Sequence, residues 1–233
     1  MDISEYQFKT ELHAHTSPVS ACSEISPEDV IKKYAECGYH SVVISNHFDS
    51  GMKWRSGDKD PVDFYLSGYR EACAAGEKYN INVILGCEIR FDENCNDYLL
   101  FGIDADDLKI AYTYLEKGIK EFSKFFRTQQ RALVQAHPFR DGMADCAPEF
   151  LDGIEAFNMH PHHNSRISVA AKYAEQNNFI VTGGTDFHHD GHQGLCALLT
   201  KTEIKDSFQL AQVLRSRDYL FQIGNSIVIP YGK

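Results

Sequence analysis

One segment of the chain reads Ile180-Val181-Thr182-Gly183-Gly184-Thr185-Asp186-Phe187-His188, an apolar run that ends on a carboxylate and an imidazole. Near-continuous apolar runs are typical of strands that are buried on both faces of a parallel sheet. Four further apolar runs end in the same way, on His13 and His15, His47, Glu88 and His137. In α/β barrels the chemistry gathers at the carboxyl ends of the strands. The sequence therefore predicts that these side chains meet at one rim, and such a mixture suits metal ions.

Stretches with helical periodicity separate the apolar runs. Ser26 before Pro27 is typical of a helix start, and Gly38 can end that helix. We expect further helices over residues 61–79, 106–126, 164–177 and 207–215. Strands that alternate with helices favour a parallel arrangement with the helices outside, and so an α/β fold. Because no linker or repeat divides the chain, we expect a single domain over residues 1–233.

The composition disfavours several classes of function. A formal net charge of -10 is unlike the basic surface of nucleic-acid-binding proteins, so no nucleic-acid partner is expected. The seven cysteines are scattered and form no C-x-x-C pair, which argues against a disulfide framework and a zinc finger. No apolar run is long enough to span a bilayer, and residues 1–10 show no secretory signal. We expect a cytoplasmic protein without a membrane partner, and the pattern leaves the oligomeric state open.

Two pairs of residues spaced i, i+2 indicate a metal site. On an extended strand His13 and His15 would point to the same face, about 7 Å apart, and could converge on one ion. Asp186 and His188 repeat this spacing with a carboxylate. The alternative is a set of separately satisfied core histidines, but that alternative gives no reason for all of them to stand at strand ends.

Five short motifs occur in the order known from the PHP family, which is named after polymerase and histidinol phosphatase. They read Glu11-Leu12-His13-Ala14-His15-Thr16, Ser45-Asn46-His47, Gly86-Cys87-Glu88, His137-Pro138 and Gly184-Thr185-Asp186-Phe187-His188. Each motif alone is unspecific, but the ordered set spans residues 11–188 and resembles the family over most of the chain. The resemblance implies a distorted (β/α)7 barrel with two or three divalent metal ions at the carboxyl-terminal rim of its strands.

The resemblance also implies a ligand set. His13, His15, Glu88 and Asp186 would hold one ion, and Glu88 would bridge to a second ion held with His137 and Asp97. A third ion would use His47, His188 and a residue of the loop after the first motif, where the family commonly has His or Asp. This chain has Ser20-Ala21-Cys22-Ser23-Glu24 there, so Glu24 and Cys22 are alternatives or the third site is weak. Asn46 replaces the family's Asp, which we expect to alter a hydrogen bond around a ligand. Imidazole and carboxylate ligands suit Zn, Mn or Fe.

The implied activity is metal-dependent hydrolysis of a small phosphorylated metabolite, such as histidinol phosphate or a nucleotide. Closely spaced divalent ions activate a water molecule and neutralise charge on phosphoryl oxygens. Arg140 and Arg166 are candidate phosphate contacts, with Arg90 a further donor, because arginine binds phosphate oxygens in a bidentate manner. The alternative for each is a surface arginine paired with a carboxylate. His160 is a candidate general acid.

Other functions stay open at this stage. An amidohydrolase-type enzyme acting on a non-phosphate substrate also begins with an H-x-H pair, although that superfamily normally bridges its ions with a lysine where this chain has Glu88. A module attached to a polymerase and a non-catalytic metal-binding scaffold are two further alternatives. The polar residues 48–60 follow the strand that ends at His47, and they predict either a lid over the site or a solvated loop.

Overall fold

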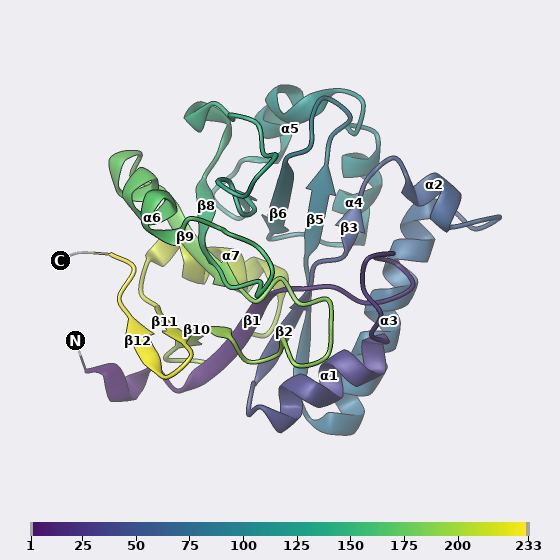
Figure 1. The fold of residues 1–233 in the computed structure, drawn as a ribbon. Helices are drawn as coiled ribbons and strands as arrows, with labels where there is room; N and C mark the ends of the chain where they lie inside the picture. Colours follow the sequence, from purple (N-terminus) through teal and green to yellow (C-terminus); the bar gives the residue numbers. More distant parts are fainter. Residues whose placement is uncertain (1, 232–233) are drawn as a thin grey trace.

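The strands of the computed structural model, which describes residues 2–231, form two six-stranded sheets (Figure 1). The first sheet has the order β12-β11-β10-β1-β2-β4 and the second the order β3-β5-β6-β7-β8-β9. The first comprises β1 (Phe8–Ala14), β2 (Ser41–Ile44), β4 (Asn82–Leu85), β10 (Cys196–Thr200), β11 (Leu220–Ile223) and β12 (Ser226–Val228). The second comprises β3 (His47–Phe48), β5 (Cys87–Arg90), β6 (Asp97–Phe101), β7 (Ala132–Gln135), β8 (Gly153–Asn158) and β9 (Ile180–Gly184).

Both sheets mix parallel and antiparallel pairs, so the expectation of parallel strands is wrong for part of the fold. In the first sheet β2 is parallel to both β1 and β4. In the second sheet β3 is parallel to β5, and β8 is parallel to both β7 and β9. β6 is antiparallel to both β5 and β7, and β10 is antiparallel to both β1 and β11. The reason at β5 and β6 is that residues 91–96 are too few for the crossover that parallel neighbours need.

The expected barrel is confirmed only as a mixed α/β fold, because the strand pairs within residues 2–231 form two sheets and no closed barrel. The sheets meet where β2 leads into β3 through Ser45 and Asn46, and where β4 leads into β5 through Gly86. On the other side a single parallel bridge joins Ala14, at the end of β1, to Phe187. The carboxyl end of β1 therefore lies at the seam between the two sheets.

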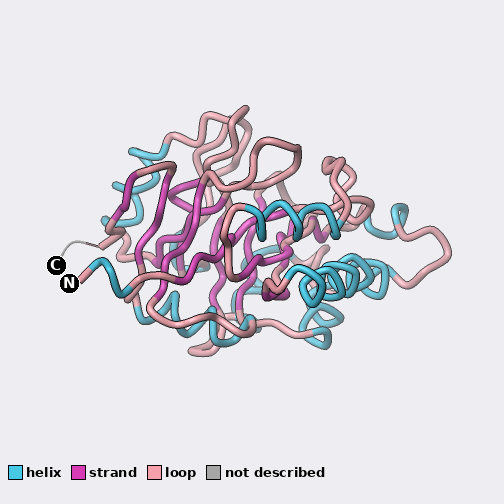
Figure 2. Tube along the Cα trace, turned by 90° about the horizontal axis from the view of Figure 1, so that it is seen from below, coloured by secondary structure: helices cyan, strands magenta, loops and turns pink. Residues whose placement is uncertain are grey.

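The helices lie outside the strands, as the view from below shows (Figure 2). They are α1 (Pro27–Glu36), α2 (Met52–Arg55), α3 (Pro61–Tyr79), α4 (Ala105–Tyr112), α5 (Gly118–Phe126), α6 (Ile167–Gln176) and α7 (Ser207–Ser216), with short 3-10 helices at Ile3–Glu5 and Pro148–Phe150. Ser26 caps α1 as predicted, because its Oγ accepts a hydrogen bond from the backbone N–H of Asp29 at 3.2 Å. None of the helices in residues 2–231 combines the length and the apolarity that crossing a bilayer requires.

One predicted helix, over residues 106–126, is instead the two helices α4 and α5. The break falls before Gly118, whose φ of +79° disfavours any residue with a side chain. A Cβ at this position would clash with the carboxylate of Glu93, and Glu93 Oε1 accepts a hydrogen bond from the backbone N–H of Ile119 at 3.0 Å. The apolar periodicity continues across the break, which is why the sequence indicated one helix.

Two buried apolar clusters hold this framework together. The larger draws residues from both sheets, including Leu12, Leu99 and Val181, and the smaller packs α1 and α3 on the first sheet through residues such as Val30 and Val42. Burial of apolar surface on this scale is the main favourable contribution to folding. The strand ends that carry the polar residues are therefore anchored in a packed core.

Candidate metal centre

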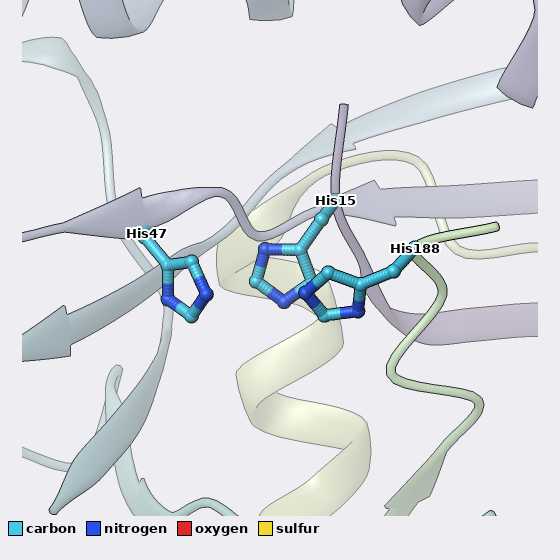
Figure 3. A group of neighbouring side chains, drawn as sticks. All are labelled: His15, His47 and His188. Carbon is cyan, nitrogen blue, oxygen red and sulfur yellow. The ribbon is translucent and has the colours of Figure 1, made fainter. Parts of the chain in front are cut away.

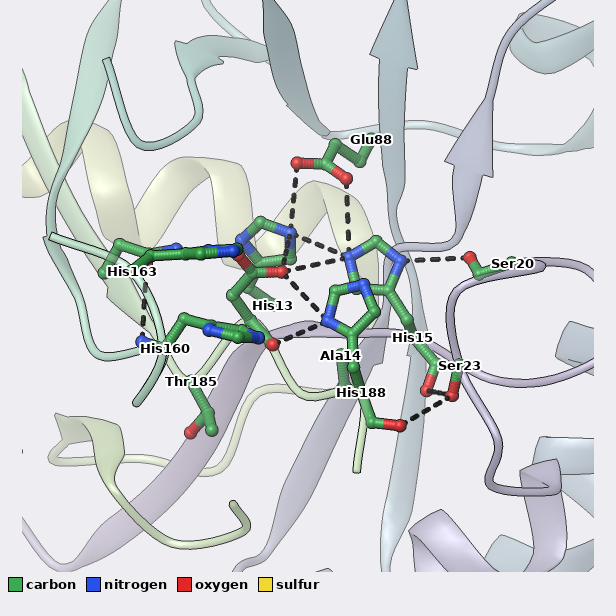
Figure 4. A network of polar contacts seen from close by, with 12 residues as sticks. His13, Ala14, His15, Ser20, Ser23, Glu88, His160, His163, Thr185 and His188 are labelled. Carbon is green, nitrogen blue, oxygen red and sulfur yellow. Dashed lines mark hydrogen bonds and ion pairs between the residues drawn. The ribbon is translucent and has the colours of Figure 1, made fainter. Parts of the chain in front are cut away.

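The predicted ligands come together at the seam between the two sheets. His13 lies in β1 and His15 just beyond it, Glu88 lies in β5, and Asp186 follows β9. Figure 4 shows His13, His15, Glu88 and His188 pointing toward one another from these separate segments. His13, His15, Glu88 and Asp97 are fully buried, and His137 and Asp186 are almost so. His13 and His15 therefore converge as their i, i+2 spacing predicts, whereas Asp186 and His188 lie beyond β9 and Asp186 has a φ of +53°.

Four side chains converge at the centre of this cluster. His13 Nε2 lies 3.0 Å from His15 Nε2, 3.2 Å from Glu88 Oε1 and 3.5 Å from Asp186 Oδ1. His15 Nε2 lies 3.4 Å from both Glu88 Oε2 and Asp186 Oδ1. These two nitrogens and two carboxylates come from the two different sheets, so the cluster spans the seam.

Hydrogen bonds on the far side of each ring indicate where the protons lie. His13 Nδ1 is 2.9 Å from Glu155 Oε1, a carboxylate that can only accept, so Nδ1 carries the proton. His15 Nδ1 is 3.0 Å from Ser20 Oγ, and that hydroxyl donates its own proton to Asn46 Oδ1, so His15 Nδ1 donates as well. Both Nε2 lone pairs then face each other beside two carboxylates. Such a set of acceptors is stable around a cation, so the residues fit a divalent metal ion.

Further ligand atoms extend the cluster in two directions from Glu88. Three overlapping groups each offer ligand atoms that lie within 4.8 Å of one another: His13 with His15 and Glu88, His15 with His47 and His188, and His47 with Glu88 and Asp97. His137 Nε2 lies 3.1 Å from Glu88 Oε1, and His47 Nδ1 lies 2.7 Å from Glu88 Oε2. Figure 3 shows the imidazoles of His15, His47 and His188 grouped together.

Burial and the close packing of charges shift the pKa values of these groups in opposite directions. Burial lowers the pKa of His13, but the carboxylates of Glu155, Asp186 and Glu88 together raise it well above its usual range. Burial raises the pKa of Glu88, but His13 and His47 hold it well below its usual range. A metal ion and a proton would therefore compete for His13.

Asp97 and Arg90 form a tight pair beside the cluster. Arg90 Nε and Nη2 donate to the two carboxylate oxygens of Asp97 at 2.7 and 2.6 Å. Burial and the charge of Glu88 raise the pKa of Asp97, whereas Arg90 opposes this rise. Asp97 Oδ2 also lies 3.9 Å from His137 Nε2, so Asp97 is close enough to share the second predicted ion with His137 and Glu88.

A cavity of about 600 Å³ opens over the cluster, and its walls are polar. Arg90, Arg140, His137, His160 and Asp186 line it, whereas residues 48–60 and Arg166 do not. Arg140 Nη1 donates to His163 Nδ1 at 3.3 Å, and Arg140 lies 4.0 Å from both Asp97 and Asp186. Residues 48–60 are only partly solvated, because they contain α2 and the fully buried Phe48 and Met52, while Trp54 is 84% exposed.

Arg166 does not reach the cavity, in contrast to the prediction that it contacts phosphate. Its Nη1 donates to the backbone carbonyl of Phe139, and its Nη2 donates to Asp141 Oδ1, each at 2.6 Å. This is the carboxylate-paired surface arginine that the sequence offered as the alternative. Arg166 is thus engaged by Phe139 and by Asp141, which itself lines the cavity.

His160 lies at the cavity wall with a neutral ring. Its Nδ1 accepts a hydrogen bond from the backbone N–H of His162 at 3.2 Å, which places the ring proton on Nε2. Burial lowers the pKa of His160 to about 3. The ring can donate a hydrogen bond from Nε2 at neutral pH, but this environment disfavours the charged imidazolium form that the general-acid prediction requires.

The sequence analysis missed two buried carboxylates that support the cluster. Glu155 in β8 contacts His13 Nδ1 and also accepts a hydrogen bond from the backbone N–H of His137 at 3.1 Å. Glu11 accepts hydrogen bonds from the backbone N–H groups of His13 and Thr185, each at 2.9 Å. Burial raises the pKa of Glu11 to about 6. A single carboxylate within an otherwise apolar strand was the available signal for Glu155.

The two departures from the family motifs have distinct places in the structure. Asn46 Oδ1 accepts hydrogen bonds from the backbone N–H of Thr16 and from Ser20 Oγ, at 2.7 and 2.9 Å, so it acts through Ser20 on His15, as expected of a residue around a ligand. Cys22 lines the cavity, whereas Glu24 does not. Burial raises the pKa of the Cys22 thiol, but hydrogen bonds with His188 and His47 lower it, with a net value of about 6.

The mixed α/β fold thus carries a buried cluster of imidazoles and carboxylates at its strand ends. Comparison with protein families identifies the family of this domain. The model of the PHP domain matches residues 11–221. The chain therefore belongs to the PHP-domain family, which confirms the resemblance found in the sequence.

Individual relatives are distant. The PolC-type DNA polymerase III of Oceanobacillus iheyensis is 24% identical over 184 residues, which are 67% of this chain, and the chain spans only 12% of that curated relative. A two-domain protein of Bacteroides vulgatus, described as containing a predicted PHP-like metal-dependent phosphoesterase, matches with a TM-score of 0.63 and 17% identity over 96% of this chain and 67% of that one. An amidohydrolase of Chromobacterium violaceum, with bound sulfate and no metal, matches with a TM-score of 0.55 and 15% identity over 95% of this chain and 98% of that one. Both structures share the fold.

Proposed function

We propose that this chain is a metal-dependent phosphoesterase that hydrolyses a small phosphorylated metabolite with water as the nucleophile. The observation that carries the proposal is the convergence of the His13 and His15 lone pairs with Glu88 and Asp186 below a polar cavity. We propose two or three divalent ions of zinc, manganese or iron. Their ligands would be His13, His15, His47, Glu88, Asp97, His137, Asp186 and His188. We further propose that the two sheets and the bridge between Ala14 and Phe187 are an opened form of a seven-stranded barrel.

The residues of the chain prepare the site for this reaction. When bound, divalent ions lower the pKa of a water molecule and neutralise charge that develops on phosphoryl oxygens. Glu155 and Ser20 hold the rings of His13 and His15 so that both Nε2 atoms point into the cluster, where a metal ion would take the place of a proton. Arg140 lies at the cavity wall with a guanidinium that can bind phosphate oxygens. His160 Nε2–H can donate a hydrogen bond to the leaving oxygen.

The cavity supports a small and hydrophilic substrate. Its volume of about 600 Å³ is in the range of small-molecule sites, and its lining is rich in histidine and arginine. The net charge of -10 argues against a nucleic-acid track. We therefore propose histidinol phosphate or a nucleotide, rather than a polynucleotide, as the class of substrate. The match to a DNA polymerase concerns the domain alone.

The test begins with metal analysis of the purified protein. It continues with a screen of phosphorylated metabolites and a generic aryl phosphate, with released phosphate as the readout. Chelation and His13→Ala should each abolish phosphate release while the helical circular-dichroism signal stays. His40→Ala is the matched control, because His40 lies outside the cavity lining, and it should keep activity. Phosphate release that survives exhaustive chelation would refute the proposal.

A second candidate is an amidohydrolase-type enzyme that acts on a non-phosphate substrate. The fold similarity to the Chromobacterium violaceum amidohydrolase favours it. The bridging position counts against it, because Glu88 lies where that superfamily normally has a lysine. A parallel screen of amides and lactones separates the two, since hydrolysis of these substrates without phosphate release would favour the second candidate.

A further inference from the structure

The loop that follows β1 returns across the rim of the metal centre, and it is held on both sides of Cys22. The backbone N–H of Ser20 donates to the carbonyl of Thr16, and that of Ser23 donates to the carbonyl of Ser20, each at 3.0 Å. Ser23 Oγ also contacts the carbonyls of His15 and His188 at 3.2 and 3.3 Å, as Figure 4 shows. Cys22 is therefore fixed over the cluster by its neighbours.

The thiol of Cys22 faces a group of three imidazoles. It lies within hydrogen-bonding contact of the rings of His188 and His47, and it lines the same cavity. The ring of His15 lies between these two, with centroid distances of 4.4 Å to His47 and 4.2 Å to His188. Each of the three rings offers a ligand atom within 4.8 Å of the others. Cys22 thus contacts two of the three imidazoles that form this group.

A separate observation also indicates a cation at this side of the centre. Glu88 Oε2 is fully buried and accepts no hydrogen bond of good geometry from residues 2–231. It lies 2.7 Å from His47 Nδ1 and 3.4 Å from His15 Nε2, so it is directed at two of the three imidazoles. A buried carboxylate oxygen without a hydrogen bond is costly unless a cation compensates its charge.

Glu24, the other residue of the loop with a ligand atom, is directed elsewhere. Its side chain is 78% exposed, and its Oε2 lies 3.5 Å from Nδ1 of His189, outside the three-imidazole group. It is absent from the cavity lining that contains Cys22. Of the two alternatives that the sequence left open, the geometry therefore favours Cys22 over Glu24.

We propose that Cys22 binds a metal ion as a thiolate, together with His15, His47 and His188, and that this ligand makes the position selective for zinc. This inference rests on the metal centre of the proposed function. On binding, the S–H bond breaks, the proton passes to the solvent, and a sulfur–metal bond forms without any change of oxidation state. Thiolate and imidazole ligands favour Zn²⁺, whereas Mn²⁺ and Mg²⁺ prefer oxygen ligands.

Cobalt substitution tests the sulfur–metal bond without measuring activity. The metal-free protein loaded with Co²⁺ should show a near-ultraviolet sulfur-to-cobalt charge-transfer band. Cys22→Ser should lose this band, and Cys37→Ser, which changes an exposed cysteine at the end of α1, should keep it. Glu24→Ala should also keep it. A band that is absent from the unsubstituted protein, or that persists in Cys22→Ser, overturns the proposal.

Alkylation of the unsubstituted protein supplies a measurement that needs no variant to fold. Zn²⁺ should slow the reaction of Cys22 with iodoacetamide, followed by mass spectrometry of peptides, and leave the reaction of Cys37 unchanged. An unchanged rate at Cys22 contradicts the proposal. Failure here is distinguishable from failure of the proposed function, because phosphate release without a charge-transfer band removes only the role of Cys22.

The metal preference gives a third readout. Loaded from an equimolar mixture of Zn²⁺ and Mn²⁺, the unsubstituted protein should retain zinc at this position, and Cys22→Asp should shift the retained metal toward manganese. Metal content by mass spectrometry measures the shift. Equal ratios of zinc to manganese in the two proteins would exclude a selective role for the thiolate.

Discussion

Two groups of histidines in this molecule are built in opposite ways. The inner cluster (His13, His15, Glu88 and Asp186) lies at the seam of the sheets, and buried partners hold the far nitrogen of both its imidazoles. The outer rim (His160, His162, His163 and His189) lines the cavity, and rings within it pack on one another, with centroids 3.9 Å apart for His160 and His163. When a carboxylate fixes the proton on one ring nitrogen, the other nitrogen presents a lone pair in a fixed direction. A ring that only stacks on another ring still has an N–H that can donate to a substrate. The hydrogen-bond partners of an imidazole therefore distinguish a potential metal ligand from a potential substrate contact.

The largest effect should follow from a change within the inner cluster. Glu88→Gln removes the charge that four imidazoles share, and we expect metal binding to fall and phosphate release to drop by about 1000-fold or more. Metal-assisted charge stabilisation contributes several kcal/mol, and about 1.4 kcal/mol corresponds to a factor of ten. Metal content and phosphate release measure the effect. Glu175→Gln, on the exposed surface of α6, is the control. Full activity in Glu88→Gln would show that the inner cluster does not differ from the outer rim in holding the metal.

An intermediate effect should follow from the buried partner of the cluster. In Glu155→Gln, one amide NH₂ must face either His13 Nδ1–H or the two donors on Oε2, which are the backbone N–H of His137 and Nδ2 of Asn158. We expect metal affinity to fall by about 10- to 100-fold, as is typical for partners of ligating histidines. Titration with a metal-sensitive dye measures the affinity. The control is Glu149→Gln in the 3-10 helix Pro148–Phe150, and an affinity equal to that of the unsubstituted protein would contradict the role of Glu155.

Glu11, beneath the inner cluster, should make folding stability depend on pH. Burial raises its pKa from 4.5 to about 6, so the folded state binds a proton more tightly than the unfolded state. The stability gained is fully present below pH 4.5 and is lost as pH rises through 6, a change of about 2 kcal/mol. Urea unfolding in the presence of a chelator, compared between the unsubstituted protein and Glu11→Gln, measures it. A difference between the two that stays constant from pH 4 to pH 7 would argue against this assignment.

The smallest effect should come from the outer side of the cavity. Arg140→Ala removes the guanidinium from the wall, and we expect KM to rise about tenfold, since a hydrogen bond to a charged group contributes about 1.5 kcal/mol or more. Metal content should stay unchanged, because Arg140 binds no ion. Arg166→Ala serves as the matched control and should leave KM within about twofold, because Arg166 pairs with Asp141 but is not itself part of the cavity lining. Loss of metal in Arg140→Ala would erase the distinction between cluster and rim.

Strand periodicity predicted that His13 and His15 share one face, and the common rim of neighbouring strands predicted that the side chains at the strand ends meet. Asp186 and His188 lie beyond β9, and Asp186 has a φ of +53°, so strand periodicity does not explain their placement. Glu155 was missed because its role depends on β8 passing behind β1, which no local pattern reveals. The break at Gly118 and the antiparallel β6 were missed for related reasons, since a positive φ and a short connection leave helix and strand periodicity intact. For Arg166 the sequence left both phosphate binding and pairing with a carboxylate open, because sequence position does not fix the direction of a long side chain.

Gly184 permits the close approach of β9 to β1, because a Cβ at this position would lie 2.5 Å from the Cβ of His13. Since His13 belongs to one sheet and Glu88 to the other, an ion bound by both residues would link the two sheets. Ligands that bind only the folded state stabilise it in proportion to their supply. Cells short of the metal would then hold a chain that opens first along this seam and is degraded sooner, so protein abundance would follow metal availability.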